Sequence, residues 1–140
     1  NNDQSKSGKA NTSASEKGNK DKHHAAAADE PLKLNNGEKW PTDRSTRQGM
    51  QSIDSLVDAY EEKNQLGLSD YNQLGDGIHN RMKTILKECS MEGPAHQELH
   101  KFIAKIHPHI KNLRSDNEKQ AGQSFDQVVE LVDKYPRYFK

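Results

Sequence analysis

Four histidines stand close together in the chain and are the residues best placed to do chemistry. They are His96, His100, His107 and His109. The stretch that contains them is predicted to be helical, and His96 and His100 are spaced four residues apart, one turn along the same helix face. Two imidazoles at that spacing can share one metal ion. His96 and His100 are therefore the centre of a candidate copper or zinc site.

A metal site needs further ligands, and neighbouring segments offer some. His107 lies about two turns beyond His100, roughly 10 Å along a straight helix, which is too far unless a kink at Pro108 brings it closer. The other neighbours able to ligate are His79, Cys89 and Glu92. The candidate metal set is His96, His100, Cys89 and His79. In the alternative interpretation these histidines form a half-exposed polar boundary on the flank of a helix bundle.

Cys89 is the only cysteine among the 140 residues, so no disulfide can form within the chain. A catalytic thiolate usually needs a helix N-terminus or a paired histidine beside it. Cys89 is predicted near a helix C-terminus, where the macrodipole disfavours an anion, and on the apolar face of that helix. We expect a small buried side chain, or part of a soft-metal site if His100 lies across the turn.

The motifs of common enzyme classes are missing from the sequence. It has no glycine-rich phosphate loop, no Gly-x-Ser-x-Gly nucleophile elbow and no dinucleotide fingerprint. The 21 basic and 21 acidic residues give a formal charge of zero, and this balance argues against nucleic acid, which requires a clustered basic surface. The sequence therefore predicts a protein that is not an enzyme and does not bind nucleic acid.

The N-terminal part has a different composition from the rest. Residues 1–30 contain no Val, Ile, Leu, Met, Phe, Trp or Tyr, so they cannot bury enough surface to offset the entropy of ordering. Residues 1–31 are predicted to be a disordered polar linker, in which His23 and His24 could bind metal loosely. No stretch approaches the roughly 18 consecutive apolar residues of a membrane span. Membrane attachment is therefore expected only through a lipid anchor, which would be carried by a cysteine just before Asn1.

Four amphipathic helices are predicted, over residues 43–64, 70–90, 94–114 and 117–135. Their apolar residues recur three or four positions apart, and no segment alternates with period two. Short turns between the helices predict an all-α, antiparallel up-down-up-down four-helix bundle over residues 42–140. Residues 32–41 are expected to be an extended segment that packs on the bundle, with Trp40 as an apolar lid. Pro136 is expected to end the last helix.

One string of residues resembles a known group of proteins. It runs Asn-Gly-Glu-Lys-Trp-Pro-Thr-Asp over residues 36–43 and is followed by Arg-Gln-Gly-Met over residues 47–50. This string is similar to the start of a group of small proteobacterial envelope proteins, although Thr46 stands where their pattern has Leu. Cys89, Leu99-His100 and the terminal Tyr135-Pro-Arg-Tyr-Phe139 extend the resemblance. It implies an exported protein of the periplasm or envelope, with a signal peptide and, as one form, an outer-membrane lipoprotein.

That group in turn resembles the haem-carrying bundles of cytochrome c-prime and the soluble b-type cytochromes. Covalent haem attachment needs Cys-x-x-Cys-His, which a single cysteine excludes. The b-type resemblance implies a Met early in the first helix and a His late in the fourth. Met50 could take the first position, but the fourth helix offers only Tyr135. Haem is therefore disfavoured, and Met50 is expected to be a core residue.

Three functions are compatible with these observations. The leading hypothesis is a non-enzymatic envelope protein, periplasmic or lipid-tethered, that acts as a binding or interaction module for an unknown protein partner and carries no cofactor. The alternative is a copper- or zinc-handling protein that uses the histidines of the third helix. A haem-binding electron-transfer protein is the most distant option.

Overall fold

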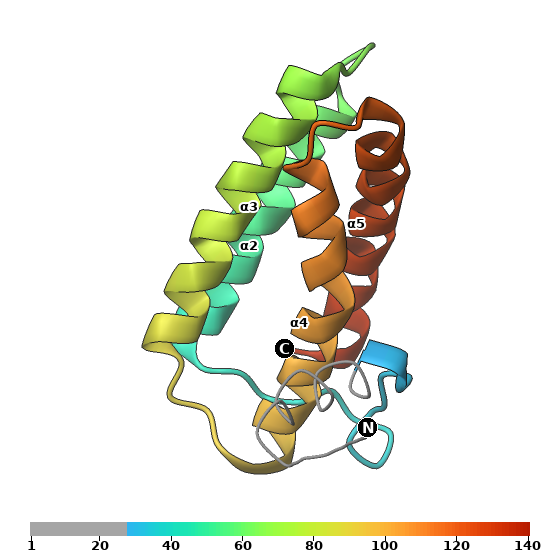
Figure 1. The fold of residues 1–140 in the computed structure, drawn as a ribbon. Helices are drawn as coiled ribbons and strands as arrows, with labels where there is room; N and C mark the ends of the chain where they lie inside the picture. The colour runs from blue at the N-terminus through green and yellow to red at the C-terminus, as the bar shows by residue number, and fades with distance from the viewer. Residues whose placement is uncertain (1–27) are drawn as a thin grey trace, which may run out of the picture. The chain divides into compact units, whose positions relative to one another are not determined.

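The computed structural model describes residues 28–140, and residues 1–27, which make up most of the predicted linker, lie outside the described residues. The chain divides into two units, Asn1–Pro31 and Leu32–Lys140. The second unit contains four helices: α2 (Arg44–Glu61), α3 (Leu68–Glu88), α4 (Gly93–Leu113) and α5 (Glu118–Tyr138). Successive helices run in opposite directions (Figure 1), and the described residues form no strand. The predicted all-α four-helix bundle is confirmed.

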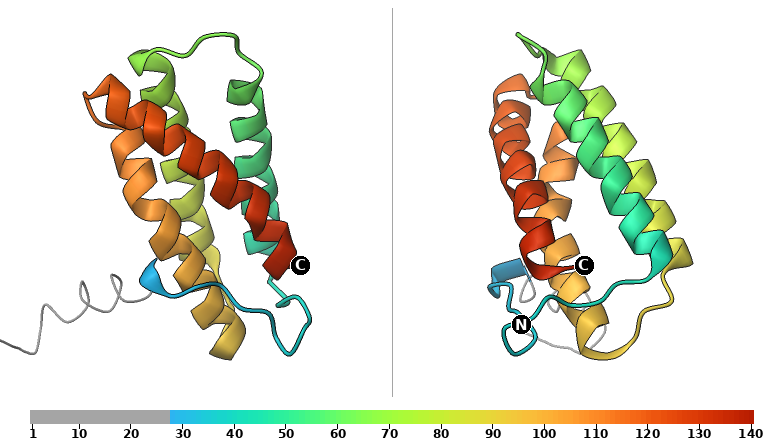
Figure 2. Two further views of the ribbon diagram at one scale, coloured as in Figure 1. Left: turned by 90° about the vertical axis from the view of Figure 1, so that its right-hand side faces the viewer. Right: turned by 180° about the vertical axis from the view of Figure 1, so that it is seen from behind.

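The helices pack as two closely associated pairs. α2 lies on α3 and α4 lies on α5, while α3 also contacts α4 and α5, and α2 contacts α5. The α2–α3 pair is inclined to the α4–α5 pair (Figure 2). None of these helices is long and apolar enough to cross a membrane, a finding that covers residues 28–140.

The core is formed by the apolar faces that the sequence pattern predicts. Ile53, Ile78, Phe102 and Val128, one from each helix, are fully buried. Burying side chains of this size contributes about 1.5–3 kcal/mol each relative to leaving them exposed. Leu86 departs from the prediction: its position places it on the apolar stripe of α3, yet 47% of its surface is exposed.

Asp43 begins α2 and ties it to the connection between α3 and α4. Its Oδ1 accepts a hydrogen bond from the Thr46 backbone N–H at 2.9 Å, which makes it the N-cap. Its Oδ2 accepts from the backbone N–H and the hydroxyl of Ser90, at 2.7 and 3.0 Å. Burial by itself would raise the pKa of Asp43, but the hydrogen bonds from Ser90 and Thr46 hold it well below its ordinary value. The carboxylate is therefore a charged clasp between two segments that are distant in the sequence.

The segment before α2 pairs with the end of the chain. The Trp40 N–H donates to the Tyr138 carbonyl at 2.8 Å, and the Lys140 N–H donates to the Trp40 carbonyl at 2.9 Å. These bonds form a parallel bridge between Trp40 and Phe139. Phe139 is buried and Trp40 is half-buried against the core. Residues 32–41 thus form a strap on the bundle that joins the two ends of the second unit.

Two predicted helix boundaries are wrong. Pro136 does not end the last helix, which continues to Tyr138. Pro136 lies in the last turn, where it removes only one backbone hydrogen bond, and this turn is held by stacking of Tyr135 on Phe139 at 4.7 Å. The second predicted range also begins too late, because α3 starts at Leu68 rather than residue 70, with Gly67 as its N-cap and the Gly67 N–H donating to the Asp70 carboxylate at 2.9 Å. α2 ends at Glu61 and α3 begins at Leu68, so the corner lies earlier in the chain than the predicted ends at residues 64 and 70.

Candidate functional site

The connection between α3 and α4 brings a thiol and two imidazoles together. Cys89 is the C-cap of α3, and His96 and His100 lie in the first two turns of α4. The Cys89 Sγ is 3.8 Å from the His96 Nδ1, and the rings of His96 and His100 meet edge to face with centroids 4.4 Å apart. Gly93 begins α4 with a φ of +73°, a conformation that glycine adopts without strain, so the chain can turn sharply between the two helices. We call Cys89, His96 and His100 the turn cluster.

The separation of Cys89 and His96 suits a shared ion. Metal–sulfur and metal–imidazole bonds are about 2.3 Å and about 2.0–2.1 Å long. A metal at those distances from two atoms 3.8 Å apart would subtend an angle of about 120°, which lies within the range of trigonal and tetrahedral coordination. Without a metal, the same contact is a hydrogen bond between thiol and imidazole. The pair can therefore hold a soft ion without a large rearrangement.

The turn cluster provides only part of a coordination shell. Among residues 28–140, no group of three or more His, Cys, Asp or Glu side chains is arranged to hold a metal ion. This finding covers Glu92, the exposed N-cap of α4. Met91 is a further soft donor beside the cluster, with its Sδ 3.7 Å from the Thr46 hydroxyl that donates to it. The sequence reasoning missed Met91, although the spacing Cys-x-Met was visible.

Both sides of the turn cluster are anchored from other parts of the bundle. On the α3 side, Asp43 holds Ser90, and the Ser45 hydroxyl donates to the Glu88 carbonyl at 3.3 Å. On the α4 side, Glu98 lies between the two histidines in the sequence and is only 6% exposed. Its carboxylate accepts from the Lys33 N–H at 2.5 Å and pairs with the Lys101 ammonium at 3.0 Å. The N-terminus of α2 and the strap thus position the two halves of the cluster.

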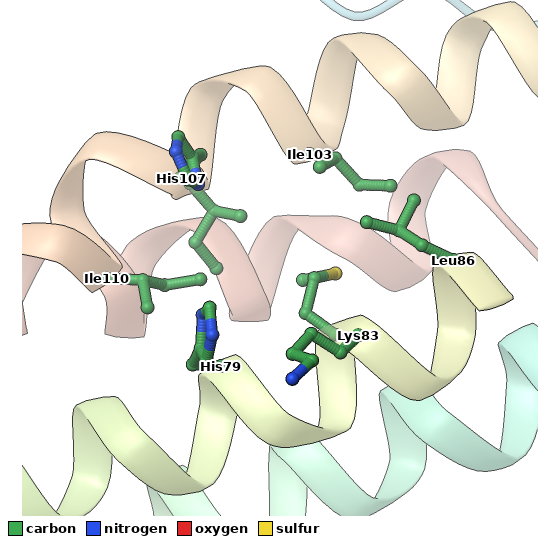
Figure 3. A pocket seen from close by; sticks show the side chains of 8 residues that line it. His79, Lys83, Leu86, Ile103, His107 and Ile110 are labelled. Carbon is green, nitrogen blue, oxygen red and sulfur yellow. The ribbon is translucent and has the colours of Figure 1, made fainter.

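His79, the fourth residue of the candidate metal set, lies elsewhere. It precedes Cys89 by ten residues on α3, about 15 Å along the helix axis. It lines a small cavity between α3 and α4 that His107 of α4 also lines (Figure 3). This cavity, which we call the α3–α4 groove, has a volume of about 110 Å³ and is lined by His79, Met82, Lys83, Leu86, Ile103, Ile106, His107 and Ile110. The structure therefore divides the histidines between two places.

His109 has a structural environment. Its Nδ1 is 3.1 Å from the hydroxyl oxygen of buried Ser124, which also accepts a hydrogen bond from the Asn112 side chain at 2.9 Å. A hydroxyl has one O–H and two lone pairs, so Ser124 can accept from Asn112 and also donate to the Nδ1 of a neutral His109. Burial lowers the pKa of His109, which agrees with this arrangement. His109 thus joins α4 to α5.

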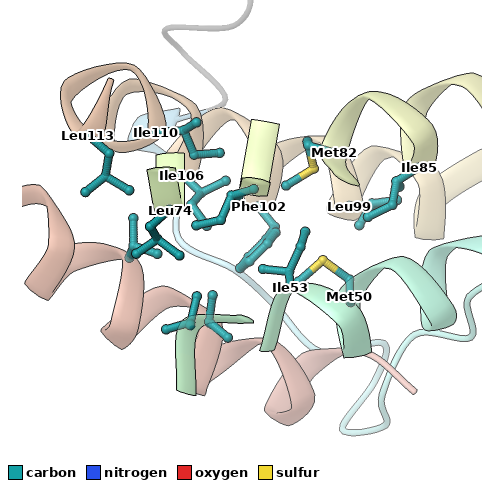
Figure 4. Close-up of a cluster of buried hydrophobic side chains, with 14 of the residues drawn as sticks. Met50, Ile53, Leu74, Met82, Ile85, Leu99, Phe102, Ile106, Ile110 and Leu113 are labelled. Atoms are coloured by element: carbon teal, nitrogen blue, oxygen red, sulfur yellow. The ribbon is translucent and has the colours of Figure 1, made fainter. Parts of the chain in front are cut away.

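The two residues considered for haem border one cavity between α2 and α5. Its volume is about 290 Å³, and Met50 and Tyr135 are both among its lining residues. Met50 is 4% exposed and packs among the core side chains (Figure 4). The Tyr135 hydroxyl is buried with no hydrogen-bond partner in the described part of the chain, and burial raises the pKa of Tyr135. A phenol that keeps its proton is a weak iron ligand, so this geometry does not favour haem.

The fold and the turn cluster define a class of protein: an all-α bundle that presents a thiol and an imidazole at one of its turns. No protein-family model matches the chain, and no match is found among curated proteins or solved structures.

Proposed function

We propose that this protein is a non-enzymatic, metal-binding helical bundle of the bacterial cell envelope and that it binds Cu(I) at the turn cluster. The observation that carries the proposal is the 3.8 Å separation of the Cys89 Sγ and the His96 Nδ1. A thiolate and an imidazole are both ligands of copper, and thiolate and thioether sulfur favour the Cu(I) state.

Copper fits the turn cluster better than zinc does. A structural zinc site is normally closed by four protein ligands. Among the described residues, no three His, Cys, Asp or Glu side chains are grouped to hold a metal ion, whereas Cu(I) accepts a low coordination number. His100 packs against His96, and Met91, which follows Cys89 by two residues, carries a thioether, a further soft donor type in the same turn. The ligand types thus favour a soft monovalent ion.

The anchoring of the cluster also supports binding. A site held by packing and hydrogen bonds loses less conformational entropy when it takes up its ion. Cys89 precedes Ser90, which Asp43 fixes, and Glu98 on α4 is fixed by Lys33 and Lys101. The pair is therefore held in place before metal arrives.

The test is a Cu(I) titration under anaerobic conditions against a competing chelator. The protein should carry His23→Ala and His24→Ala, so that the N-terminal pair cannot contribute. We expect about one Cu(I) per chain, and loss of this binding in Cys89→Ser and in His96→Ala. His107→Ala is the matched control, because His107 lies on the same helix but lines the α3–α4 groove. Undiminished copper binding in Cys89→Ser would refute the proposal, and so would tighter binding of zinc than of Cu(I) in competition.

The envelope location rests on the resemblance of residues 36–50 to envelope proteins. Cell fractionation of the natural gene product, with mass spectrometry of its N-terminus, tests it. Export with a lipidated cysteine before Asn1 would establish a tethered lipoprotein, and export without lipid a periplasmic protein. Recovery in the cytoplasm would contradict this part of the proposal while leaving the copper site open to its own test.

A role in binding another protein has less support. An interaction surface usually exposes a contiguous apolar patch of a few hundred Å². Among the described residues, Leu34 and Leu86 are the large hydrophobic side chains that are exposed, at 42% and 47%. They lie in the strap and on α3 respectively. The thiol–imidazole pair is therefore the stronger basis for a function.

A further inference from the structure

The α3–α4 groove is polarised along its length. His79 of α3 and His107 of α4 line one end, and Lys83 lies one turn further along α3 (Figure 3). At the other end are Leu86 of α3 and Ile103 of α4 (Figure 3). The floor between the ends is apolar and consists of Met82 and Ile106, and Ile110 borders the end at which His79 lies (Figure 3). The groove thus has a basic end and an apolar end, joined by an apolar floor.

The basic groups form no ion pair among residues 28–140, although Asp76 is near enough to His79 to act on its pKa. Among residues 28–140, His79, Lys83 and His107 make no hydrogen bond or ion pair. Arg114 also acts on His79, but its own guanidinium is paired with Asp76 at 2.8 Å. Three nitrogen-bearing side chains therefore surround one end of an apolar cavity, and their hydrogen-bonding capacity is unused by the described protein groups.

The apolar end of the groove exposes hydrophobic surface that no described residue covers. Leu86 is 47% exposed although it lies on the apolar stripe of α3, and Ile103 opposite is half-buried. From His79 to Leu86 the groove follows about two turns of helix, roughly 10 Å. A cavity of about 110 Å³ accepts a narrow aliphatic chain but not a helix or an aromatic ring system. Covering Leu86 would remove apolar surface from water, which favours binding.

We propose that the α3–α4 groove binds an aliphatic carboxylate such as a medium-chain fatty acid. The carboxylate lies at His79, Lys83 and His107, where it accepts hydrogen bonds and meets positive charge. The chain lies over Met82 and Ile106 and ends against Leu86 and Ile103. This occupant satisfies both ends at once, whereas an aliphatic cation meets like charge and a neutral chain leaves the basic groups unpartnered.

This inference goes beyond the proposed copper function and does not depend on it. The groove and the turn cluster share no residue, so a variant of one leaves the other intact. Loss of copper binding in Cys89→Ser should therefore leave carboxylate binding unchanged. The two proposals can fail separately.

The experiment is a titration of the full chain with sodium octanoate, whose extended length matches the groove. Binding is measured by calorimetry and by the NMR signals of the backbone amides of α3 and α4. Octanol and octylammonium serve as neutral and cationic probes of the same chain length. We expect octanoate to bind at least about tenfold more tightly than either. The combined variant His79→Ala, Lys83→Ala and His107→Ala should weaken octanoate binding at least about tenfold, and Leu86→Ser should weaken all three probes.

Lys87→Ala is the matched control, because Lys87 is an exposed cation on α3 that does not line the groove. It should bind octanoate like the parent protein. Equal binding of the three probes would overturn the proposal, since it would show an apolar cleft without charge selection. Unchanged binding in the triple variant, or no binding at millimolar octanoate, would overturn it too. Circular dichroism of each variant shows that any loss comes from a folded bundle.

Discussion

The turn cluster and the α3–α4 groove are built on the same two helices, and each contains two histidines. In the turn cluster, His96 meets the Cys89 thiol at 3.8 Å. In the groove, His79 meets Lys83 and His107 and lies near Arg114. A thiol beside an imidazole makes a donor set for a cation, whereas ammonium and guanidinium groups beside an imidazole make a receptor for an anion. The neighbours, rather than the histidines, determine which kind of ligand each place can take.

The largest expected effect is an opposite dependence on pH. Between about pH 7.5 and pH 5.5, the affinity for Cu(I) should fall about a hundredfold, because thiol and imidazole must give up protons to bind a metal. Over the same range the affinity for octanoate should rise several-fold, because His79 gains a proton. Burial lowers the pKa of His79, assisted by Arg114, Lys83 and His107 and opposed by Asp76. The contribution of His79 should therefore come in the lower half of that range.

Competition titrations at several pH values for each ligand measure these two slopes. If copper affinity and octanoate affinity changed in the same direction with pH, the contrast between a cation site and an anion site would be wrong. The combined variant His79→Ala and His107→Ala is the control. It should flatten the octanoate slope and leave the copper slope as it is.

The next largest effect is the loss of stability expected when the Asp43 carboxylate is removed. Asp43→Ala removes the N-cap of α2 and two charge-assisted hydrogen bonds to Ser90. The free energy of unfolding should fall by about 3 kcal/mol at pH 7 in urea titrations. Because Ser90 adjoins Cys89, copper affinity should fall as well, while octanoate affinity should not change. A loss of octanoate binding equal to that of copper would show that the two sites are not independent.

The same carboxylate has a defined dependence on acid. Its pKa in the folded protein lies below the ordinary 3.8, so the folded state binds fewer protons than the unfolded state as pH falls. Its contribution is therefore fully present above about pH 5 and is lost as the pH falls below about 4. The difference in stability between the parent protein and Asp43→Asn should shrink on going from pH 7 to pH 3. A constant difference would show that charge is not the cause.

Alanine substitutions at Gly75 and Gly49 would each disturb a different contact between helices. A Cβ on Gly75 of α3 would lie 2.7 Å from the Arg114 Cγ and 2.9 Å from the Leu113 Cβ. Gly75→Ala gains about 1 kcal/mol of helix propensity, but the overlap should outweigh it and destabilise the fold by about 1–2 kcal/mol net. It should weaken octanoate binding by moving α3 from α4. The counterpart Gly49→Ala overlaps the Ile85 side chain between α2 and α3, so it should lower stability without affecting the groove.

The smallest expected effect involves His109, a histidine in neither site. Burial lowers its pKa from the ordinary 6.5, so the unfolded chain takes up a proton more readily than the folded protein. Stability should therefore decrease as the pH falls below about 6.5, by less than about 1 kcal/mol. His109→Gln should remove part of this slope in thermal unfolding between pH 7 and pH 5. Since the lowered pKa of His79 acts in the same direction, His79→Gln is measured alongside to separate the two.

The helices follow from the sequence, but their ends do so only in part. Apolar residues three or four apart predict all four helices because a buried helix face requires that period. Pro136 was expected to stop the last helix, and the stacking of Tyr135 on Phe139, a tertiary contact, holds that turn instead. Leu86 was expected inside because it lies on the apolar stripe of α3. Its exposure was decided by how α3 sits against α4, which periodicity cannot specify.

For the candidate site, local spacing was sufficient only within one helix or one short turn. His96 and His100 share a face because they are four residues apart, and Cys89 reaches His96 because a short connection joins α3 to α4. His79 could not be placed from the sequence, because its neighbours come from the packing of α3 on α4. The sequence pattern does not single out Met91 as a ligand, because a methionine in an amphipathic helical chain most often fills the core. The sequence by itself determined which residues can form helices and which side chains can donate to a metal. Only the tertiary structure decided which of those side chains meet, because contacts between helices depend on packing angles and offsets that the apolar pattern leaves open.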